Sequence, residues 1–392
     1  MVRQRLQAAG VLQPDGGGPG LLGQRMHGPD DAALQRHWRQ EWAQAFQGEG
    51  RDLRQRLQAG LLLGELGDNL RYDRRQMQDG SWHPGLRLKP ALWAAVGSPG
   101  QPNWFCIGSD RDDDQAFGGE KPPFLQALDY FEMASCPVTV GEWTRFVAAE
   151  GYKDSQAVWW QAAGAAAQAW LRGRQGDNPG TVVVPNNWGH ASQSNPLQPV
   201  TGITAHEALA YVAWAAPLYN DEVRAGQPGG LRLALPTEVQ WEAGVRGGPA
   251  GPQDKRLQQR WPGQDIGQQA GALDFNHANT RWGWPSPVGV FSRSTTHHGV
   301  ADAAGNVWQW CSNAVDQRAT QGYEGLARQW AANLQVDPLD GQTERALRGG
   351  SFNLTSGHCR VAYRNHNHPG DVNNSIGVRL VRCVPLTLNP EP

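Results

Sequence analysis

The chain has 392 residues, a formal net charge of −2 and a hydrophobic fraction of 39%, which suits one large domain or two modest ones. The charge is nearly balanced and the sequence has no basic stripe, which argues against nucleic acid as a partner. No apolar run approaches the ~18 residues of a membrane helix. The first residues lack the apolar core of a signal peptide, and five scattered cysteines form no Cys-x-x-Cys motif. We therefore expect a cytoplasmic protein with reduced thiols and no membrane partner.

The N-terminal part, residues 1–103, is expected to comprise a flexible terminus, a helical segment and a linker. Residues 1–25 are rich in Gly and Pro, which predicts a flexible terminus. Apolar side chains at helical spacing between 30 and 66 predict a helical segment that ends at Gly67. A linker that contains three prolines is expected to lead to the main domain.

From about residue 104 the pattern changes to short strands, two helices and long loops. The helices are predicted over 138–149 and 203–215, and Thr204 with Glu207 predicts a capping box at the start of the second. The loops over 150–200 and 250–285 are long and rich in Trp, whose side chains can pack them. This main domain is expected to span 104–383, followed by a tail at 384–392.

The most unusual feature is the composition of the 26 residues from Asn353 to Val378. They include no Lys, Glu, Gln, Trp or Met, and every amino acid present can be encoded by a codon that ends in a pyrimidine. Randomising the two adenines of an Asn codon reaches this set and never produces a stop codon. The segment therefore has the composition expected of a surface that has been rewritten at its Asn codons.

A fixed frame surrounds this segment. Gly349 and Gly350 permit close backbone packing or a positive φ, and residues 376–381 predict a buried terminal strand. Four arginines are placed to anchor the segment by bonds to carboxylates or carbonyls: Arg348, Arg360, Arg364 and Arg379. If this frame holds the main chain, the exposed side chains between can change at a cost within ~0.5 kcal/mol each.

Several ordered motifs over about 280 residues resemble the formylglycine-generating-enzyme/sulfatase-modifying domain. They are Phe105-Cys-Ile-Gly-Ser-Asp, Pro137-Val-Thr-Val-Gly-Glu-Trp-Thr-Arg-Phe, Leu235-Pro-Thr-Glu-Val-Gln-Trp-Glu-Ala, Ala304-Gly-Asn-Val-Trp-Gln-Trp, Leu347-Arg-Gly-Gly-Ser-Phe, Cys359-Arg-Val-Ala-Tyr-Arg and Ile376-Gly-Val-Arg-Leu. The resemblance implies an α+β protein with a variant of the C-type lectin fold, preceded here by a small helical segment. A fold does not by itself settle function.

Two enzyme branches of this family define the alternative function. The formylglycine-generating enzymes use two cysteines five residues apart, and the matching positions here are Leu354 and Cys359. A lone Cys359 breaks the thiol pair needed for copper and oxygen chemistry, and it fits a small buried hydrophobe. The sulfoxide synthases carry an iron site with a His-x-x-x-His-x-Glu motif, whose spacing His27, His37 and His83 do not match. We therefore expect no enzymatic activity, with an oxygen-dependent enzyme of either type as the alternative.

A third branch, the variable proteins of diversity-generating retroelements, matches the C-terminal frame best. In these proteins an error-prone reverse transcriptase copies a template with mutations at adenines, and the product replaces the end of the variable gene. The shared frame runs from Leu347 through the Asn-rich positions to Asn373-Asn-Ser-Ile-Gly-Val378-Arg379, with Val378 in place of an aromatic residue. The resemblance implies a ligand-binding protein whose variable region, 345–381, is a diversified surface on a constant scaffold.

The candidate ligand-binding residues are Asn353, Leu354, Thr355, Ser356, His358, Tyr363, Asn365, His366, Asn367, His368, Asp371, Val372, Asn373 and Ser375. The ligand is expected to be an unidentified protein or small molecule. Two alternatives remain open. Residues 353–375 can form an ordinary polar loop, because Asn, Gly and Ser are common turn residues, or the chain can serve as a structural scaffold.

Calcium is the one cofactor that the resemblance raises. A family calcium site lies at the Gly-Asn-x-Trp-x-Trp motif, and the matching positions are Asp302, Gly305, Val307 and Gln309. Gln309 stands where a Glu is usual, so the affinity is expected to be lower, and the alternative is that this motif only fills the core. A metal site at His358, His366 and His368 is not expected, because no carboxylate or Cys partner accompanies them at a fixed spacing.

Overall fold

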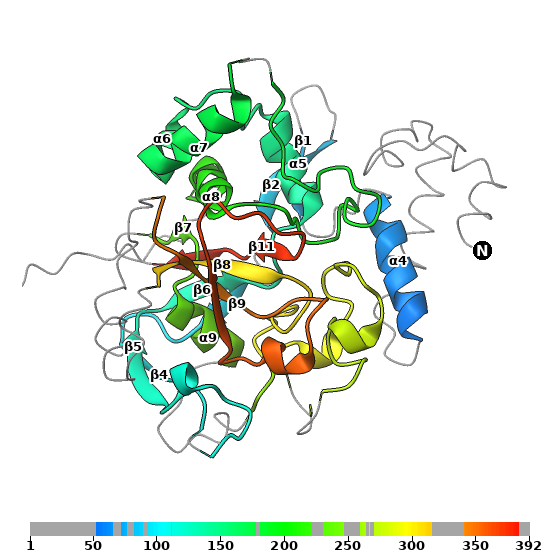
Figure 1. Ribbon diagram of the computed structural model, residues 1–392, viewed down its shortest axis with the longest axis vertical. Coiled ribbons are helices and arrows are strands. Elements are labelled where there is room, and N and C mark those ends of the chain that lie inside the picture. Colours follow the sequence, from blue (N-terminus) through cyan, green and yellow to red (C-terminus); the bar gives the residue numbers. More distant parts are fainter. Residues whose placement is uncertain are drawn as a thin grey trace, which may run out of the picture.

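Two four-stranded sheets form the centre of the computed structural model, which describes residues 52–65, 72–76, 82–88, 93–110, 112–177, 181–220, 230–246, 259–263, 266, 270–315 and 341–383 (Figure 1). The expected flexible terminus, most of the expected N-terminal helix and the tail at 384–392 lie outside these residues. The mixture of helices and sheets agrees with the expected α+β class.

The first sheet has the strand order β10-β9-β8-β11, and the second has the order β3-β6-β12-β7. Their strands are β8 (Trp308–Ala314), β9 (Arg345–Arg348), β10 (Arg364–Asn367), β11 (Ile376–Val378), β3 (Trp93–Val96), β6 (Phe131–Ala134), β12 (Val381–Cys383) and β7 (Arg232–Ala234). Pairing in the first sheet is antiparallel except between β11 and β8. Two further hairpins pair β1 (Tyr72–Gln76) with β2 (Trp82–Leu88) and β4 (Asn103–Ile107) with β5 (Phe124–Leu128).

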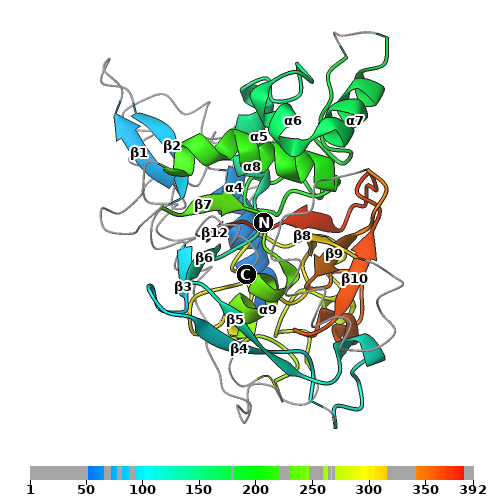
Figure 2. The ribbon, with the colours of Figure 1, turned by 90° about the vertical axis from the view of Figure 1, so that its left-hand side faces the viewer.

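The described helices are α4 (Leu53–Glu65), α5 (Val140–Ala148), α6 (Val158–Ala163), α7 (Ala165–Gln175), α8 (Ala205–Asn220) and α9 (Glu238–Arg246). Short 3-10 helices are η2 (Gly118–Glu120), η4 (Ala278–Thr280), η5 (Ser292–Ser294) and η7 (Ser356–Cys359). Figure 2 shows α5 to α8 on one side of the first sheet and α9 on the other. Among the described residues, no helix is long and apolar enough to cross a membrane.

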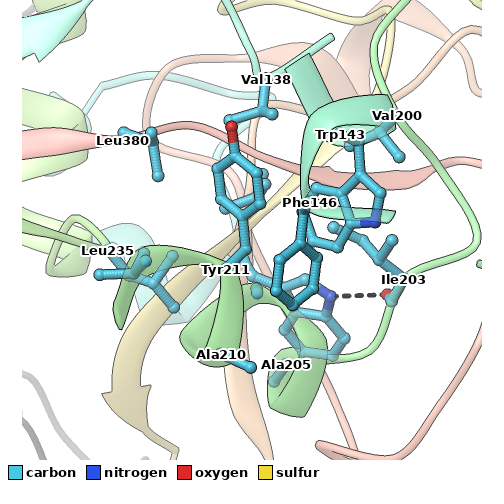
Figure 3. Packing of buried hydrophobic residues seen from close by; sticks show 14 of the residues in the cluster. Val138, Trp143, Phe146, Val200, Ile203, Ala205, Ala210, Tyr211, Leu235 and Leu380 are labelled. Carbon is cyan, nitrogen blue, oxygen red and sulfur yellow. Dashed lines mark hydrogen bonds between the residues drawn. The ribbon is translucent and has the colours of Figure 1, made fainter. Parts of the chain in front are cut away.

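Alternating side chains of the first sheet feed two separate cores. In β9, Leu347 belongs to the larger core with Trp310 of β8, whereas its neighbour Ala346 belongs to a second core with Cys311. The larger core contains α5 and α8, where the rings of Trp143 and Tyr211 stack at 4.5 Å (Figure 3). The strands β8, β9 and β11 are therefore packed on both faces, whereas the residues of β10 are half-buried.

Three helices begin with a capping box, and we predicted only the one at Thr204. The expected capping box is confirmed, because Thr204 Oγ1 accepts from Glu207 N at 3.1 Å and Glu207 Oε2 accepts from Thr204 N at 2.7 Å. Thr139 with Glu142 opens α5 in the same way, and Thr237 with Gln240 opens α9. Both of the additional pairs carry the Thr-x-x-Glu/Gln spacing, so the sequence contained the signal for all three.

The sequence interpretation missed structure on both sides of α5. Residues 150–200 were expected to be a long loop, but they contain α6 and α7, separated by Gly164 at φ 101°. Their Ala-rich sequence has a high helix propensity, which the Trp content led us to undervalue. The expected linker before residue 104 contains β3, which pairs with β6, so the sheets begin upstream of the boundary that we expected.

Helix α4 attaches to the main domain rather than standing apart from it. Leu57 is buried against Val290 and Phe291, and Asn195 Nδ2 donates to the carbonyl of Leu61 at 2.7 Å. A Cβ at Gly64 would lie 2.0 Å from Asn195 Oδ1, so any larger residue there would displace the Asn195 side chain that holds Leu61.

Two buried carboxylates join α9 to β9. Glu242 accepts from Arg348 Nη2 at 2.5 Å and from Arg246 Nε at 2.8 Å, and Glu238 lies 3.4 Å from Arg348 Nη1. Burial alone would raise the pKa of Glu242, but the two guanidinium groups and the Gly108 amide outweigh burial and lower it. Both partners of the Arg348–Glu242 pair are nearly inaccessible. Without Glu242, Arg348 keeps only the longer contact with Glu238, which also pairs with Arg364, and Arg246 loses its carboxylate, so buried positive charge is poorly compensated.

We predict that Glu242→Gln lowers the free energy of unfolding by about 3 kcal/mol or more, because Arg348 then stays buried without its closest carboxylate. Urea denaturation at pH 7 measures the change. The control is Glu150→Gln, whose pair with Lys153 is exposed and should contribute less than about 1 kcal/mol. Equal effects of the two substitutions would contradict the role assigned to the buried pair.

A second prediction concerns Glu207, whose carboxylate accepts from Tyr152 and Thr204 inside the larger core. Burial raises the pKa of Glu207 from 4.5 to about 7, against the effect of these hydrogen bonds. The folded state therefore holds a proton between about pH 4.5 and 7 that the unfolded state has released, so stability falls as pH rises through this window. Glu207→Gln should remove up to about 3 kcal/mol of this fall. Denaturation midpoints at pH 5 to 8 check this, and an unchanged pH slope would assign the effect to another group.

Candidate functional site

Most of the predicted binding residues are exposed or half-buried along η7, β10 and the turn that leads to β11, on either side of the buried residues 359–362. The exposed members are Asn353, Thr355, Asp371, Val372 and Asn373. The half-buried members are Leu354, Ser356, His358, Tyr363, Asn365, His366, Asn367 and His368. We call these residues the C-terminal strip.

Ser375 requires a correction. It is only 3% exposed, its hydroxyl donates to Asn373 Oδ1 at 2.9 Å, and its carbonyl accepts from Trp308 N at 2.8 Å. These contacts place Ser375 in the frame of β11 rather than on the surface. Asn374, which we did not include, is exposed.

Surrounding loops hold the strip by its main-chain carbonyl groups. Ala278 N donates to the carbonyl of Leu354 at 2.8 Å, and Trp261 Nε1 donates to that of Ser356 at 3.1 Å. Near the other end, the carbonyl groups of Pro369, Asn373 and Asn374 accept from Ala205 N, Gly202 N and Gln193 Nε2 respectively. A carbonyl group is the same in every residue, so these contacts do not depend on the side chain that the strip carries.

Arginines of the frame complete this attachment, as the sequence predicted. Arg360 forms a two-bond pair with buried Glu120 at 2.5 and 2.8 Å, and Arg364 forms one with Glu238 at 2.8 and 2.6 Å. Arg348 donates to the carbonyl of Val361 at 2.8 Å. The strip is thus fixed by charged hydrogen bonds that are stronger than neutral ones.

The two glycines and Arg379 also occupy the roles that we expected. Gly349 and Gly350 have φ values of 99° and 73°, and a Cβ at Gly350 would lie 2.6 Å from Cys359 Sγ. Arg379 is fully buried, and it donates to the carbonyl groups of Ala134 and Ala301 at 2.7 and 2.6 Å. The frame is therefore closely packed around the strip.

Side chains in β10 alternate between two environments. Arg364 points to Glu238, and His366 Nδ1 lies 2.8 Å from Glu344 Oε2. Asn365 and Asn367 take the opposite face, and among the described residues neither side chain has a hydrogen-bond partner. Elsewhere in the strip the side-chain hydrogen bonds are local, as between Thr355 and His358 at 2.9 Å.

Tyr363 is the centre of an aromatic group that sequence reasoning only partly identified. Its ring lies 5.6 Å from Phe117, 5.1 Å from His358 and 6.0 Å from buried Trp308. Phe117 comes from the loop between β4 and β5 and is 59% exposed. No local signal marks Phe117, because its partner lies far away in the sequence.

Cys359 is buried beneath the strip, whereas half-buried Leu354 packs against the larger core. Cys359 is 1% exposed and packs with Trp261, Phe275 and Ala304, as expected for a small buried hydrophobe. Burial raises the pKa of its thiol to about 12. The thiolate, which is the form that binds metals and attacks electrophiles, is therefore strongly disfavoured at neutral pH.

The residues at the expected calcium positions do not fit a calcium site. Asp302 Oδ2 accepts from Gly289 N at 2.6 Å, and its Oδ1 accepts from Asn306 Nδ2 at 3.2 Å. Gln309 Oε1 accepts from Trp241 Nε1 and from the guanidinium of Arg379, and Gln309 Nε2 donates to the carbonyl of Asp302. Gly305 and Val307 are part of the same packed loop, where Gly305 N donates to the carbonyl of Gly349 at 2.7 Å. Hydrogen-bond donors, one of them cationic, already use the side-chain oxygens of Asp302 and Gln309 that calcium would need.

The histidines give no metal cluster in the part of the chain that the structure describes, where no group of three or more His, Cys, Asp or Glu is placed to hold an ion. His27 and His37 lie outside the described residues, and the side chain of His83 in β2 is not described.

Comparisons with known proteins identify the scaffold. Residues 104–384 match the model of the sulfatase-modifying factor enzyme 1-like domain. Hercynine oxygenase of Mycolicibacterium thermoresistibile is 31% identical over 279 residues, which cover 70% of this chain and 56% of that enzyme. Formylglycine-generating enzyme of Streptomyces coelicolor is 28% identical over 302 residues, which cover 72% of this chain and 88% of that enzyme.

Two solved structures are also similar. PvdO from Pseudomonas aeruginosa has a TM-score of 0.50 and 20% identity, covering 79% of this chain and 96% of its own. Variable protein 1 of Treponema denticola has a TM-score of 0.44 and 16% identity, covering 75% of this chain and 99% of its own. Identities this low bear on the fold alone.

The relatives contradict our expectation of no enzymatic activity. Curated proteins at 28–31% identity are named hercynine oxygenase and formylglycine-generating enzyme, and both names describe enzymes. The chain spans 56–59% of the length of the hercynine oxygenases that it matches. The chain has the expected C-type lectin-like fold, and it belongs to the sulfatase-modifying factor enzyme 1-like family.

Proposed function

We propose that the C-terminal strip is a ligand-recognition surface, and that adenine-directed copying of its gene diversifies it. The observation that carries this proposal is that contacts from outside the strip hold its main chain and do not depend on its side chains. The main chain is held by constant donors at the carbonyl groups of Leu354, Ser356, Pro369 and Asn373, whereas the strip's own side chains form mostly local bonds. Such a strip can change its side chains and keep its shape.

Along residues 353–374, burial also correlates with whether the codon of a residue must contain adenine. The four consecutive buried residues Cys359, Arg360, Val361 and Ala362 can all be encoded without adenine. Most exposed or half-buried positions hold Asn, His, Tyr, Thr or Asp, whose codons all contain adenine. Mutagenesis restricted to adenines would therefore spare the frame and alter the surface, which is the pattern that a recognition surface on a constant scaffold needs.

The side chains present suit reversible binding. Asn and His offer both donors and acceptors, and Tyr363 offers a large contact area at a low entropy cost, as in antibody loops. The packed frame holds these groups in place before a ligand arrives, which lowers the ordering cost of binding.

The test is to sequence the 3′ end of this gene and the DNA beside it in many members of the source population. We expect amino-acid differences to cluster at the C-terminal strip, while Gly350, Cys359, Arg360 and Arg364 stay constant. A near-copy of the segment, with adenines at the altered bases, should lie close to a reverse transcriptase gene. An invariant segment without such a template would overturn diversification and leave an ordinary polar loop.

A second candidate function is oxygen-dependent catalysis, which the sequence similarity to hercynine oxygenase and formylglycine-generating enzyme favours. In this candidate the chain would act with a copper or iron ion and oxygen, on a cysteine-containing peptide or on hercynine. Cys359 is the position that matches a family thiol, and its burial and raised pKa count against that role.

We predict that Cys359 in the native protein reacts with iodoacetamide at pH 7 at least about a hundredfold more slowly than a free cysteine, because its thiolate is scarce and its sulfur is covered. Peptide mapping by mass spectrometry measures the reaction, and the urea-unfolded protein provides the control. Rapid native labelling, joined to copper-dependent oxygen uptake that Cys359→Ser abolishes, would favour the enzymatic candidate.

A further inference from the structure

Helix α8 begins against the turn that follows β10. Ala205 N, in the first residue of α8, donates to the carbonyl of Pro369 at 3.0 Å, and Gly202 N donates to the carbonyl of Asn373 at 3.1 Å. Figure 2 shows the chain beyond β10 next to one end of α8. Two backbone hydrogen bonds therefore hold both ends of residues 369–373, which we call the 369–373 turn, to the start of this helix.

His206, the second residue of α8, is enclosed at this place. It is 3% exposed, and its ring stacks on that of Trp170 in α7, with centroids 6.2 Å apart and planes at 30°. Its Nδ1 is buried and has no hydrogen-bond partner among the described residues. A neutral imidazole leaves one ring nitrogen without a proton, whereas an imidazolium carries an N–H on both. Protonation of His206 would therefore add a buried donor that lacks an acceptor in the described part of the chain.

The groups that face His206 oppose a positive charge on its ring. Burial lowers the pKa of His206 most, and the nearby His368 and Arg345 lower it further, so that it falls from 6.5 to about 4. His368 lies just before the 369–373 turn, and Arg345 is the first residue of β9. The partial positive charge at the N-terminus of α8 acts in the same direction.

The carboxyl group next to His206 in the sequence gives little compensation. Glu207 accepts from Tyr152 at 2.8 Å and from Thr204 N at 2.7 Å, inside the larger core. Because burial raises the pKa of Glu207 to about 7, this carboxyl group is mostly protonated in mild acid. From α7, Arg174 adds a further positive charge that acts on Glu207.

The carboxylates beside the 369–373 turn have partners of their own. Asp371 Oδ2 accepts from His368 N at 3.2 Å, and Glu344 Oε2 lies 2.8 Å from His366 Nδ1. Both carboxylates are engaged with the strip rather than with His206, so they compensate little of a charge on its ring.

We propose that His206 is a proton-sensitive latch, which releases the 369–373 turn from the start of α8 when the surroundings become acidic. A proton on His206 places a charge in a closed site among positive groups. Separation of the turn from α8 gives the imidazole access to water and moves it away from His368. The bonds from Ala205 and Gly202 to the turn are then lost, while the buried glutamate–arginine pairs keep the sheets folded.

The latch would change one end of the C-terminal strip only. Residues 371–373 are exposed and belong to the released turn. The other end is held by Ala278 N and Trp261 Nε1 at the carbonyl groups of Leu354 and Ser356, far from His206 along the strip. This inference does not rest on the proposed recognition function, because the latch acts on the frame whether or not a ligand is bound.

The test is amide hydrogen exchange of the full chain at pH 7 and pH 5, with the rates corrected for the intrinsic effect of pH. We expect the protection factor of the Ala205 amide to fall about twentyfold from pH 7 to pH 5, because over this range the released state takes up the proton and the closed state does not. The amides of β8, which report global unfolding, should keep their protection. In His206→Phe, which keeps a ring against Trp170 but carries no charge, the fall should be less than about threefold.

Two further variants complete the test. His206→Gln is also unable to take up a proton, and it keeps a polar side chain if phenylalanine is not accommodated. His190→Gln is the control, since His190 is exposed and packs against Trp284, and it should keep the twentyfold fall. A fall of less than about threefold in the unmodified protein overturns the latch, and so does an undiminished fall in both His206 variants.

Discussion

The C-terminal strip depends on buried pairs between glutamates and arginines. Glu120, Glu238 and Glu242 are each no more than 3% exposed, and they receive Arg360, Arg364 and Arg348. Burying such pairs is costly, and packed apolar side chains often stabilise a core equally well. The advantage of arginine here is its surplus of donors, because Arg348 binds Glu242 and the carbonyl of Val361 together. An apolar side chain could fill the space, but it could not fix the position of the main chain.

Because the strip is held by its main chain, its side chains can change with little effect on the stability of the fold. Guanidinium groups, loop amides and the indole of Trp261 bind backbone oxygens, and the residues that provide them lie mostly outside the strip. Side chains such as Asn365 and Asn367 then carry little of the fold, although they extend from a strand in the central sheet. The same arrangement explains why Ser375 is not part of the surface, since it leads directly into buried β11.

The sequence predicted the local features of this fold well and the long-range partners poorly. The capping box at Thr204, the positive φ of Gly349 and the anchoring roles of the arginines follow from local patterns, and the structure has them. The partner of Arg360 is Glu120, 240 residues away, and one sequence gives no means of pairing them. Phe117 was missed for the same reason, because its importance comes only from the contact with Tyr363. Helices α6 and α7 were missed by a wrong weighting of composition rather than by a lack of signal.

Two positions, 354 and 359, bear most directly on how this chain relates to the enzymes of its family. The resemblance of the sequence places Leu354 and Cys359 at the positions of the reactive cysteine pair of the formylglycine-generating enzymes, and both lie within residues 353–375, whose exposed positions we propose to be diversified. A surface that is continually rewritten cannot keep a reactive pair unless both members escape mutation. Cys359 would escape, because cysteine codons contain no adenine, and its burial against Gly350 gives it a structural role that favours its retention. Position 354 is half-buried at the rim of the strip and holds leucine. A single retained thiol with a raised pKa is therefore better explained by packing in the frame than by chemistry at the surface.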